Sequence, residues 1–183
     1  MLKNKVLALV SVILFSSIGI SGCGYTSASL LPKGLDTIHV DNFANGIDTT
    51  REVSDRRMSY FYKPGIETEV TRAVIDGFIF DRHLSVESEK EADLTLKGTL
   101  VDYRQYPLSY NRDDDIEEYR VEILVNIELI NNKTGEVMWS ETNFMGQANF
   151  NVTGPNRITD PEAQREAVKD LSARIVERVV EAW

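Results

Sequence analysis

Two stretches of the chain alternate apolar and polar residues, the pattern of a β-strand with one buried face. The clearer runs from Glu118 to Ile130, where every odd-numbered position from 119 to 129 is Tyr, Val, Ile or Leu. Residues 94–100, with a continuation to Tyr106, alternate in the same way. A polar turn at residues 131–135 predicts a hairpin, whose returning strand opens at Val137 and extends as far as Phe150.

Two other stretches repeat apolar residues every three or four positions, as one face of an α-helix does. The first has Pro64 in its first turn and ends near Phe80. The second begins with Asp160 as its cap, has Pro161 at its first position, and continues to Trp183. Its apolar stripe consists of Val168, Leu171, Ile175, Val176 and Val179.

Residues 37–43 start with β-branched residues and alternate, so they predict one further strand, followed by a loop over residues 44–57. The expected order is β-α-β-β-β-α. Three consecutive antiparallel strands in this order favour an α+β two-layer sandwich, with a four-stranded, mostly antiparallel sheet and two helices on one face. We expect residues 37–183 to form this single domain.

The composition is that of a folded globular protein, with 42% hydrophobic and 27% charged residues in a chain of 183. Lys and Arg number 20 against 29 Asp and Glu, and the net charge of −9 argues against a nucleic-acid partner. One cysteine forms no internal disulfide, and His39 and His83 lack the spacing of a zinc site. No nucleophile elbow or phosphate-binding glycine loop is present, so we expect no enzyme, metal or cofactor.

The N-terminus has the three parts of a secretory signal: Lys3 and Lys5, an apolar run over residues 6–20, and Ser21-Gly22 before Cys23. The run is shorter than the roughly 20 residues that span a bilayer. Ile20-Ser21-Gly22-Cys23 resembles the bacterial lipoprotein signal, which implies removal of residues 1–22 and acylation of Cys23 with a diacylglycerol-type lipid. Residues 23–36 are then a lipidated tether. Gly24 follows the cysteine where an Asp would resemble the inner-membrane retention signal, so the resemblance implies the outer membrane, on its periplasmic side.

Several short blocks, taken in order, resemble the LptE family of lipopolysaccharide-assembly lipoproteins. The blocks are Gly22-Cys23-Gly24-Tyr25, Ala92-Asp93-Leu94, Glu118-Tyr119-Arg120 and Thr134-Gly135-Glu136-Val137-Met138-Trp139, together with a C-terminal helix that ends in Trp183. The resemblance implies a plug inside the large outer-membrane β-barrel LptD, in a 1:1 complex that helps the barrel fold and lipopolysaccharide pass outward. Two alternatives stay open: an accessory lipoprotein of an envelope ABC-type transporter, and a cell-wall-binding module. A lipid-tethered periplasmic hydrolase has the least support.

Lipopolysaccharide and this chain are both anionic, so a contact needs local cations. If the strands run up, down and up, Arg112 and Arg157 lie at one end of the sheet, with Arg104 near that end. These three arginines are the candidate lipopolysaccharide contacts, because guanidinium groups suit phosphates and carboxylates. The alternative is that they are solvated or paired with the acidic run at residues 113–115.

Aromatic residues gather around the predicted strands, and Tyr106, Tyr110 and Phe150 are the candidates for a barrel interface. Their alternative is a place in the core. The acidic run itself lacks the glycine turn and spaced oxygens of a calcium loop, so we expect a solvated hairpin tip.

Overall fold

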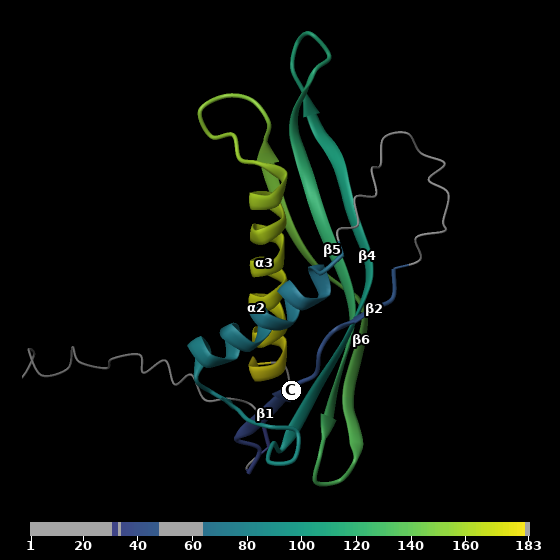
Figure 1. Cartoon of the computed structure of the whole chain (residues 1–183), viewed down its shortest axis with the longest axis vertical. Helices are drawn as coiled ribbons and strands as arrows, with labels where there is room; N and C mark the ends of the chain where they lie inside the picture. The colour runs from purple at the N-terminus through teal and green to yellow at the C-terminus, as the bar shows by residue number, and fades with distance from the viewer. Residues whose placement is uncertain (1–30, 33, 48–63, 182–183) are drawn as a thin grey trace, which may run out of the picture.

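The chain folds as a mixed β-sheet with two helices on one of its sides (Figure 1). The computed structural model describes residues 31–32, 34–47 and 64–181. In chain order, these residues form β1 (Thr37–Val40), β2 (Ala44–Asn45), α2 (Ile66–Asp81), β3 (Ser85–Val86), β4 (Leu94–Tyr110), β5 (Ile116–Asn131), β6 (Glu136–Asn151) and α3 (Asp160–Glu181). The predicted α+β class and the order of the six expected elements are confirmed.

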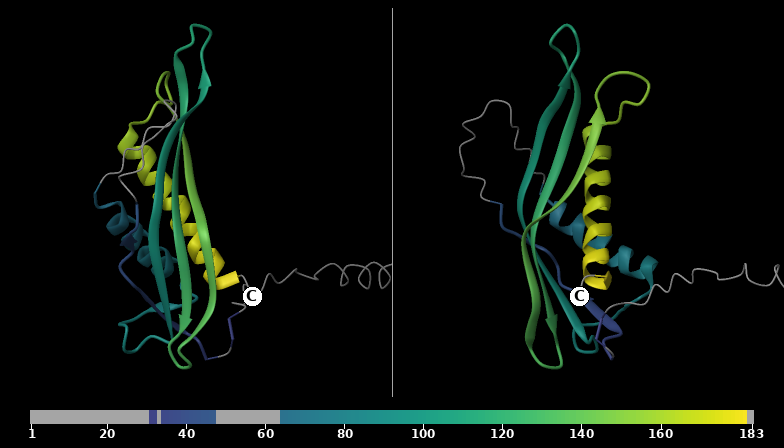
Figure 2. Two further views of the ribbon diagram at one scale, coloured as in Figure 1. Left: turned by 90° about the vertical axis from the view of Figure 1, so that its right-hand side faces the viewer. Right: turned by 180° about the vertical axis from the view of Figure 1, so that it is seen from behind.

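Three long antiparallel strands form most of the sheet (Figure 2). β4 has 17 residues, and β5 and β6 have 16 each. β5 lies between the other two, and its odd-numbered residues from Val121 to Leu129 are buried beneath the helices. The alternation that predicted this strand therefore identified its buried face correctly.

The expectation of a four-stranded, mostly antiparallel sheet needs correction. The described sheet has six strands in the order β3-β1-β4-β5-β6, with β2 also paired to β4. β1 pairs in parallel with both β3 and β4, and the β2–β4 pair is parallel as well. β2 and β3 have two residues each, too few to show a periodic pattern. The first residues of the expected loop over 44–57 thus belong to the sheet, and residues 48–57 lie outside the described residues.

α3 crosses the sheet through its predicted apolar stripe, and Leu171 packs directly on β6 at Gly146. A Cβ atom at Gly146 would overlap the Leu171 Cβ and lie 2.6 Å from the Leu171 backbone nitrogen. Only glycine permits this approach. Near the other end of the helix, Arg178 forms an ion pair with Glu141 and lies 4.5 Å from the ring centre of Trp139.

The helix starts differ by one or two residues from the expectations. α2 begins at Ile66, so Pro64 precedes it, and its N-cap is Gly65 with φ 104°. At α3, the Thr159 carbonyl accepts the first helical hydrogen bonds, and the Glu162 carboxylate accepts both the Thr159 N–H, at 2.7 Å, and the Thr159 hydroxyl. Thr159 is therefore the cap in place of Asp160. The Thr-x-x-Glu spacing is the sequence signature of a capping box.

Candidate functional site

The turn between β4 and β5 carries Arg112 at the far tip of the long hairpin. The Asn111 Oδ1 atom accepts hydrogen bonds from the backbone N–H groups of Asp113 and Asp115, at 2.8 and 3.0 Å. Asp114 takes the left-handed conformation with φ 62°. The acidic run thus folds as a tight turn around Asn111, and Arg112 projects from it as an exposed residue.

The loop between β6 and α3 carries Arg157, and it lies at the same end of the sheet as the hairpin tip (Figure 1). The Val152 N–H donates to the Glu117 carbonyl at 3.1 Å, which links the start of this loop to the start of β5. Arg157 itself forms an isolated bridge with Asn151. The expectation that the Arg112 and Arg157 segments share one end is confirmed.

Both arginines are exposed, and neither side chain has a hydrogen bond or ion pair among the described residues. Their surroundings are acidic, because Asp113, Asp114 and Glu117 share the tip with Arg112. The arginines are therefore isolated cations in an anionic neighbourhood. A ligand phosphate at this end would have to contact these guanidinium groups directly.

Arg104 does not join the other two arginines. β4 continues for six residues beyond it, about 20 Å at 3.3 Å per residue. Its Nε donates to Asp102 at 2.7 Å, so its charge is neutralised within the strand. The expectation that Arg104 lies near the tip is wrong, because the strand is longer than its alternation indicated.

Tyr106 belongs to a polar network on the far face of the sheet, the side opposite the helices. Its hydroxyl donates to Glu122 on β5, which is 8% exposed. Arg120, also on β5, donates to the Asn149 side chain on β6 at 2.8 Å. Burial is the largest cause that raises the pKa of Tyr106, and the hydrogen bond to Glu122 is the next. Three adjacent strands thus share paired polar groups.

The other two aromatic candidates have different environments. Tyr110 is 50% exposed at the end of β4, where it is accessible to a partner. Phe150 is 3% exposed and stacks on Tyr119, with ring centres 5.7 Å apart. Phe150 is a core residue, so its assignment to a barrel interface is wrong. It pairs with Tyr119 across the strands and shares the helix-facing side.

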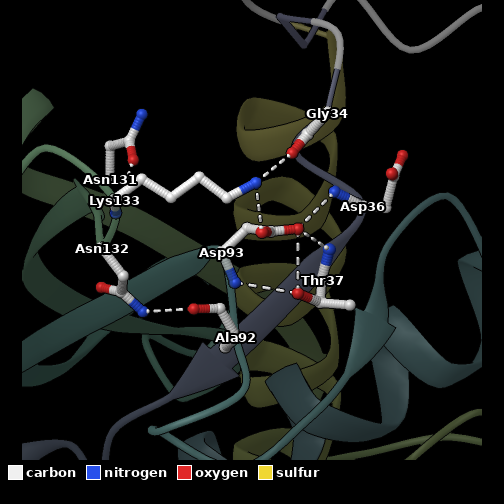
Figure 3. Close-up of polar contacts among 8 residues, drawn as sticks. All are labelled: Gly34, Asp36, Thr37, Ala92, Asp93, Asn131, Asn132 and Lys133. Atoms are coloured by element: carbon white, nitrogen blue, oxygen red, sulfur yellow. Dashed lines mark hydrogen bonds and ion pairs between the residues drawn. The ribbon is translucent and has the colours of Figure 1, made fainter.

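The opposite end of the sheet is held by Asp93, which precedes β4 (Figure 3). Its Oδ2 atom accepts hydrogen bonds from the Asp36 N–H, at 2.9 Å, and the Thr37 hydroxyl, at 3.0 Å. The Lys133 ammonium lies 2.7 Å from Oδ1 and also donates to the Gly34 carbonyl. The Lys133 hydrogen bond, followed by the backbone bond from Asp36, lowers the pKa of Asp93 to about 2. We name Asp93, Thr37 and Lys133 the Asp93 clamp.

Sequence patterns alone assigned no role to the clamp or to Glu122. The signal was nevertheless present, because Asp93 and Lys133 lie within or beside two of the blocks quoted for the family resemblance. The β4–β5 pairing brings Asp93 and Lys133 together, since Leu94 pairs with Asn131. Their contacts with Gly34, Asp36 and Thr37 depend on β1 lying parallel to β4, which the alternation of β1 does not reveal.

Cys23 lies outside the described residues, as do the signal and most of the tether. In the part of the chain that the structure describes, no helix is long and apolar enough to cross a membrane. The same residues contain no group of three or more His, Cys, Asp and Glu placed to hold a metal ion.

Comparison with known families decides the identity of the domain. A family profile described as LptE, lipopolysaccharide-assembly, matches residues 35–183. The chain belongs to the LptE family. The resemblance found in the sequence is confirmed, and this LptE-family chain is a lipoprotein of lipopolysaccharide assembly. The match spans both the Asp93 clamp and the Arg112 hairpin end.

None of the curated proteins matches this LptE-family chain. Among solved structures, it is similar to a PelC dodecamer from Paraburkholderia phytofirmans, with 16% identity, 85% and 95% of the two chains covered and a TM-score of 0.44. It is also similar to a minor lipoprotein from Acinetobacter baumannii, with 10% identity, 79% and 92% coverage and a TM-score of 0.45. Likeness at these levels has no bearing on function.

Proposed function

We propose that this LptE-family chain is the lipid-anchored plug and assembly partner of an LptD-type β-barrel in the outer membrane, and that Arg112 and Arg157 contact lipopolysaccharide. The observation that carries the proposal is the family match, which extends over nearly all the described residues. Acylation of Cys23 provides the anchor, and the chain's role is binding and assembly, without catalysis.

The far face of the sheet supports a position inside a barrel. Polar groups on this face are bonded within the sheet: Arg104 forms an ion pair with Asp102, and the Tyr106 hydroxyl donates to Glu122. A large outer-membrane barrel has a polar, water-filled interior. A surface of paired polar groups suits that lumen, whereas the lipid side of a membrane would require an apolar band.

The length of the sheet also supports the proposal. A strand of 16 residues, such as β5, extends over roughly 50 Å, and the apolar band of an outer-membrane barrel is about 25 Å tall. The tether precedes β1 at the Asp93 clamp, while Arg112 and Arg157 lie at the opposite end. A domain standing along the barrel axis, anchored on the periplasmic side, therefore brings its arginines toward the outer leaflet.

The partner is tested by affinity purification of the full lipidated chain from its native outer membrane in a mild detergent. We expect one large β-barrel protein in a 1:1 ratio. A Cys23→Ala variant controls for the membrane anchor, and we expect less barrel to co-purify with it. Recovery of the chain alone, of an ABC-type transporter or of peptidoglycan would overturn the barrel assignment.

The lipopolysaccharide contact is tested with Arg112→Ala combined with Arg157→Ala. Each guanidinium–phosphate contact contributes about 1.5–3 kcal/mol, so we expect at least tenfold weaker binding of lipopolysaccharide to the purified complex. Lys90→Ala combined with Lys97→Ala removes the same charge from exposed positions away from the tip and serves as the matched control. Equal losses in the two double variants would show a general charge effect and reject a site at the hairpin end.

A further inference from the structure

A groove runs between α2 and α3, and all the residues that line it come from these two helices. Its cavity volume is about 910 Å³, within the range of roughly 300–1,000 Å³ that is usual for small-molecule sites. Gly77 lies against Val176, where an added Cβ would be 2.9 Å from a Val176 methyl group, so the helices are in close contact along one side of the groove. The lining includes no residue of the sheet or of the hairpin end.

The groove is mainly apolar, although much of its lining is accessible to solvent. Its apolar lining consists of Ala73, Gly77, Phe80, Val168, Ala173, Val176 and Val180. Phe80 is 88% exposed, the largest exposed fraction among the large hydrophobic residues of the described chain. An accessible apolar groove of this size indicates an apolar ligand group, because burying such surface contributes about 25 cal/mol per Å².

Three cations lie in the N-terminal halves of the two helices: Arg72 on α2, and Arg165 and Lys169 on α3. A hydrogen bond of 2.9 Å from Gln164 to Glu69 joins the helices at this level. None of the three cations has an ion pair or hydrogen bond among the described residues, although Arg165 interacts electrostatically with Glu162, three residues before it on α3. The groove therefore has a cationic end with unused donors.

Four carboxylates also line the groove, and two of them are engaged elsewhere. Glu69 accepts the hydrogen bond from Gln164, and Asp81 accepts one from His83 at 2.8 Å. Asp76 and Glu177 lie one turn beyond Arg72 and two turns beyond Lys169, respectively. Glu69 lies beside the three cations, whereas Asp76, Asp81 and Glu177 lie further toward the C-terminal ends of the helices. Cations therefore outnumber carboxylates at one end of the groove, and the charged residues at the other end are all carboxylates.

We propose that this groove binds an anionic amphiphile, with its phosphate or carboxylate at Arg72, Arg165 and Lys169 and its acyl chain along the apolar lining toward Phe80. Guanidinium and ammonium groups bind phosphate oxygens, and the small side chains of Ala73 and Ala173 leave room for a hydrocarbon chain. The occupant is a lipid with an anionic headgroup. This inference concerns a second site and does not rest on the contacts proposed for the hairpin end.

The test uses the full lipidated chain in a nonionic detergent, with phosphatidylglycerol and phosphatidylcholine that carry the same fluorescent acyl chain. We expect phosphatidylglycerol to bind at least tenfold more tightly. Ala173→Trp, which fills the groove, should weaken both lipids at least tenfold, while Glu166→Trp, outside the groove on the same helix, should leave them unchanged. Arg72→Gln combined with Lys169→Gln should lower phosphatidylglycerol binding to the phosphatidylcholine level.

Equal binding to the wild-type chain and Ala173→Trp would overturn the proposal, as would an absence of preference for the anionic headgroup. Lipid binding that appears only in Cys23→Ser would overturn it too, because the chain's own acyl group would then occupy the groove.

If the wild-type chain self-associates in analytical sedimentation and Ala173→Trp abolishes this association, the groove binds a second copy of the chain. Displacement of the fluorescent lipid by unlabelled lipopolysaccharide identifies the cargo as the ligand, whereas displacement only by phosphatidylglycerol identifies a membrane phospholipid.

The two proposals fail separately. If Ala173→Trp loses the co-purifying barrel, the groove holds a protein segment and the lipid assignment is wrong, while the barrel partnership stands. If the wild-type chain recovers no barrel but retains selective lipid binding, the groove proposal stands without the proposed function. Arg112→Ala with Arg157→Ala should leave lipid binding in the groove unchanged.

Discussion

Asp93 brings together three segments that are far apart in the sequence. Its carboxylate contacts the start of β1 through Asp36 and Thr37, and the β5–β6 turn through Lys133. Asn132 adds a bond of 2.8 Å to the Ala92 carbonyl beside it. A short polar side chain at this point fixes the register of a parallel strand that has only four residues.

We predict that Asp93→Asn lowers the free energy of unfolding by roughly 1–2 kcal/mol at pH 7, because it removes charge-assisted bonds. The folded-state pKa of about 2 lies below the usual 3.8, so ionised Asp93 stabilises the fold above about pH 4 and this contribution is lost toward pH 2. Urea unfolding of both proteins at pH 7 and pH 2.5 checks this.

The gap in stability between the wild type and Asp93→Asn should therefore narrow at the lower pH. Asp113→Asn at the exposed hairpin tip is the control and should change stability by less than about 0.5 kcal/mol at either pH. A gap that stays constant between pH 7 and pH 2.5 would contradict the role of the ionised carboxylate.

The place of a residue in a strand, both its face and its distance from the strand end, was harder to predict than the strand itself. Phe150 was expected at an interface because it lies toward the Arg112 end of the sheet, yet it pairs with Tyr119 on the helix-facing side. Arg104 was expected near the tip because its strand was taken to end at Tyr106. Both errors come from the length and register of β4 and β6, which local periodicity does not determine when bulges intervene.

At the scale of elements, β4 shows how a bulge hides a strand from pattern analysis. Its register with β5 shifts between Leu100 and Asp102. Leu96 and Leu100 face the core before the shift, and Tyr103 and Gln105 are buried after it. The apolar period therefore changes from even to odd positions, and the alternation is interrupted while the strand continues to Tyr110. Where β5 shifts register against β6, between Val125 and Ile127, the extra residue lies on β6. The buried residues of β5 therefore stay at odd positions, and its sequence predicted it to within two residues.

The contact between α3 and β6 depends on Gly146. We predict that Gly146→Ala destabilises the domain by about 1–3 kcal/mol, because the new methyl group overlaps the Leu171 backbone and the helix must move away. Thermal and urea unfolding measure the loss. Thr142→Ala, at an exposed position of the same strand, should change stability by less than about 0.5 kcal/mol. Equal stability of Gly146→Ala and the wild type would show that the helix packs less closely.

At the scale of the whole molecule, the fold has two different ends. One end holds the Asp93 clamp and follows the tether, and the other extends the β4–β5 hairpin beyond α3 (Figure 1). The sequence predicted this separation, because three strands running up, down and up place Arg112 and Arg157 together. It did not predict the parallel pairing of β1 with β3 and β4 at the clamp, or that of β2 with β4, because β2 and β3 are too short for a pattern.

We predict that the hairpin tip serves binding and contributes little to folding. Replacing residues 111–115 with Asn-Gly removes Arg112 and the acidic run and joins the paired residues Tyr110 and Ile116 through a two-residue turn. The unfolding free energy should fall by less than about 1 kcal/mol, because the tip is largely exposed.

The same variant should still recover the barrel in co-purification, while lipopolysaccharide binding to the complex falls at least tenfold. A tip variant that binds lipopolysaccharide as the wild type does would place the contact elsewhere in the complex. The Arg112→Ala variant then serves as the comparison, because it tests the charge without replacing the turn.

The Asp93 clamp also has a mechanical consequence. β1 begins two residues after Leu35 and lies between β3 and β4, in parallel with both. A pulling force applied along β1 from the residues before Leu35 loads the hydrogen bonds between β1 and its two neighbouring strands in shear, all at the same time. Asp93 and Lys133 carry part of this force through their hydrogen bonds to the residues just before β1. Force applied from the other end would instead open the β4–β5 hairpin one pair at a time. The domain is therefore built to resist tension from its N-terminal side, where a membrane anchor would pull on it.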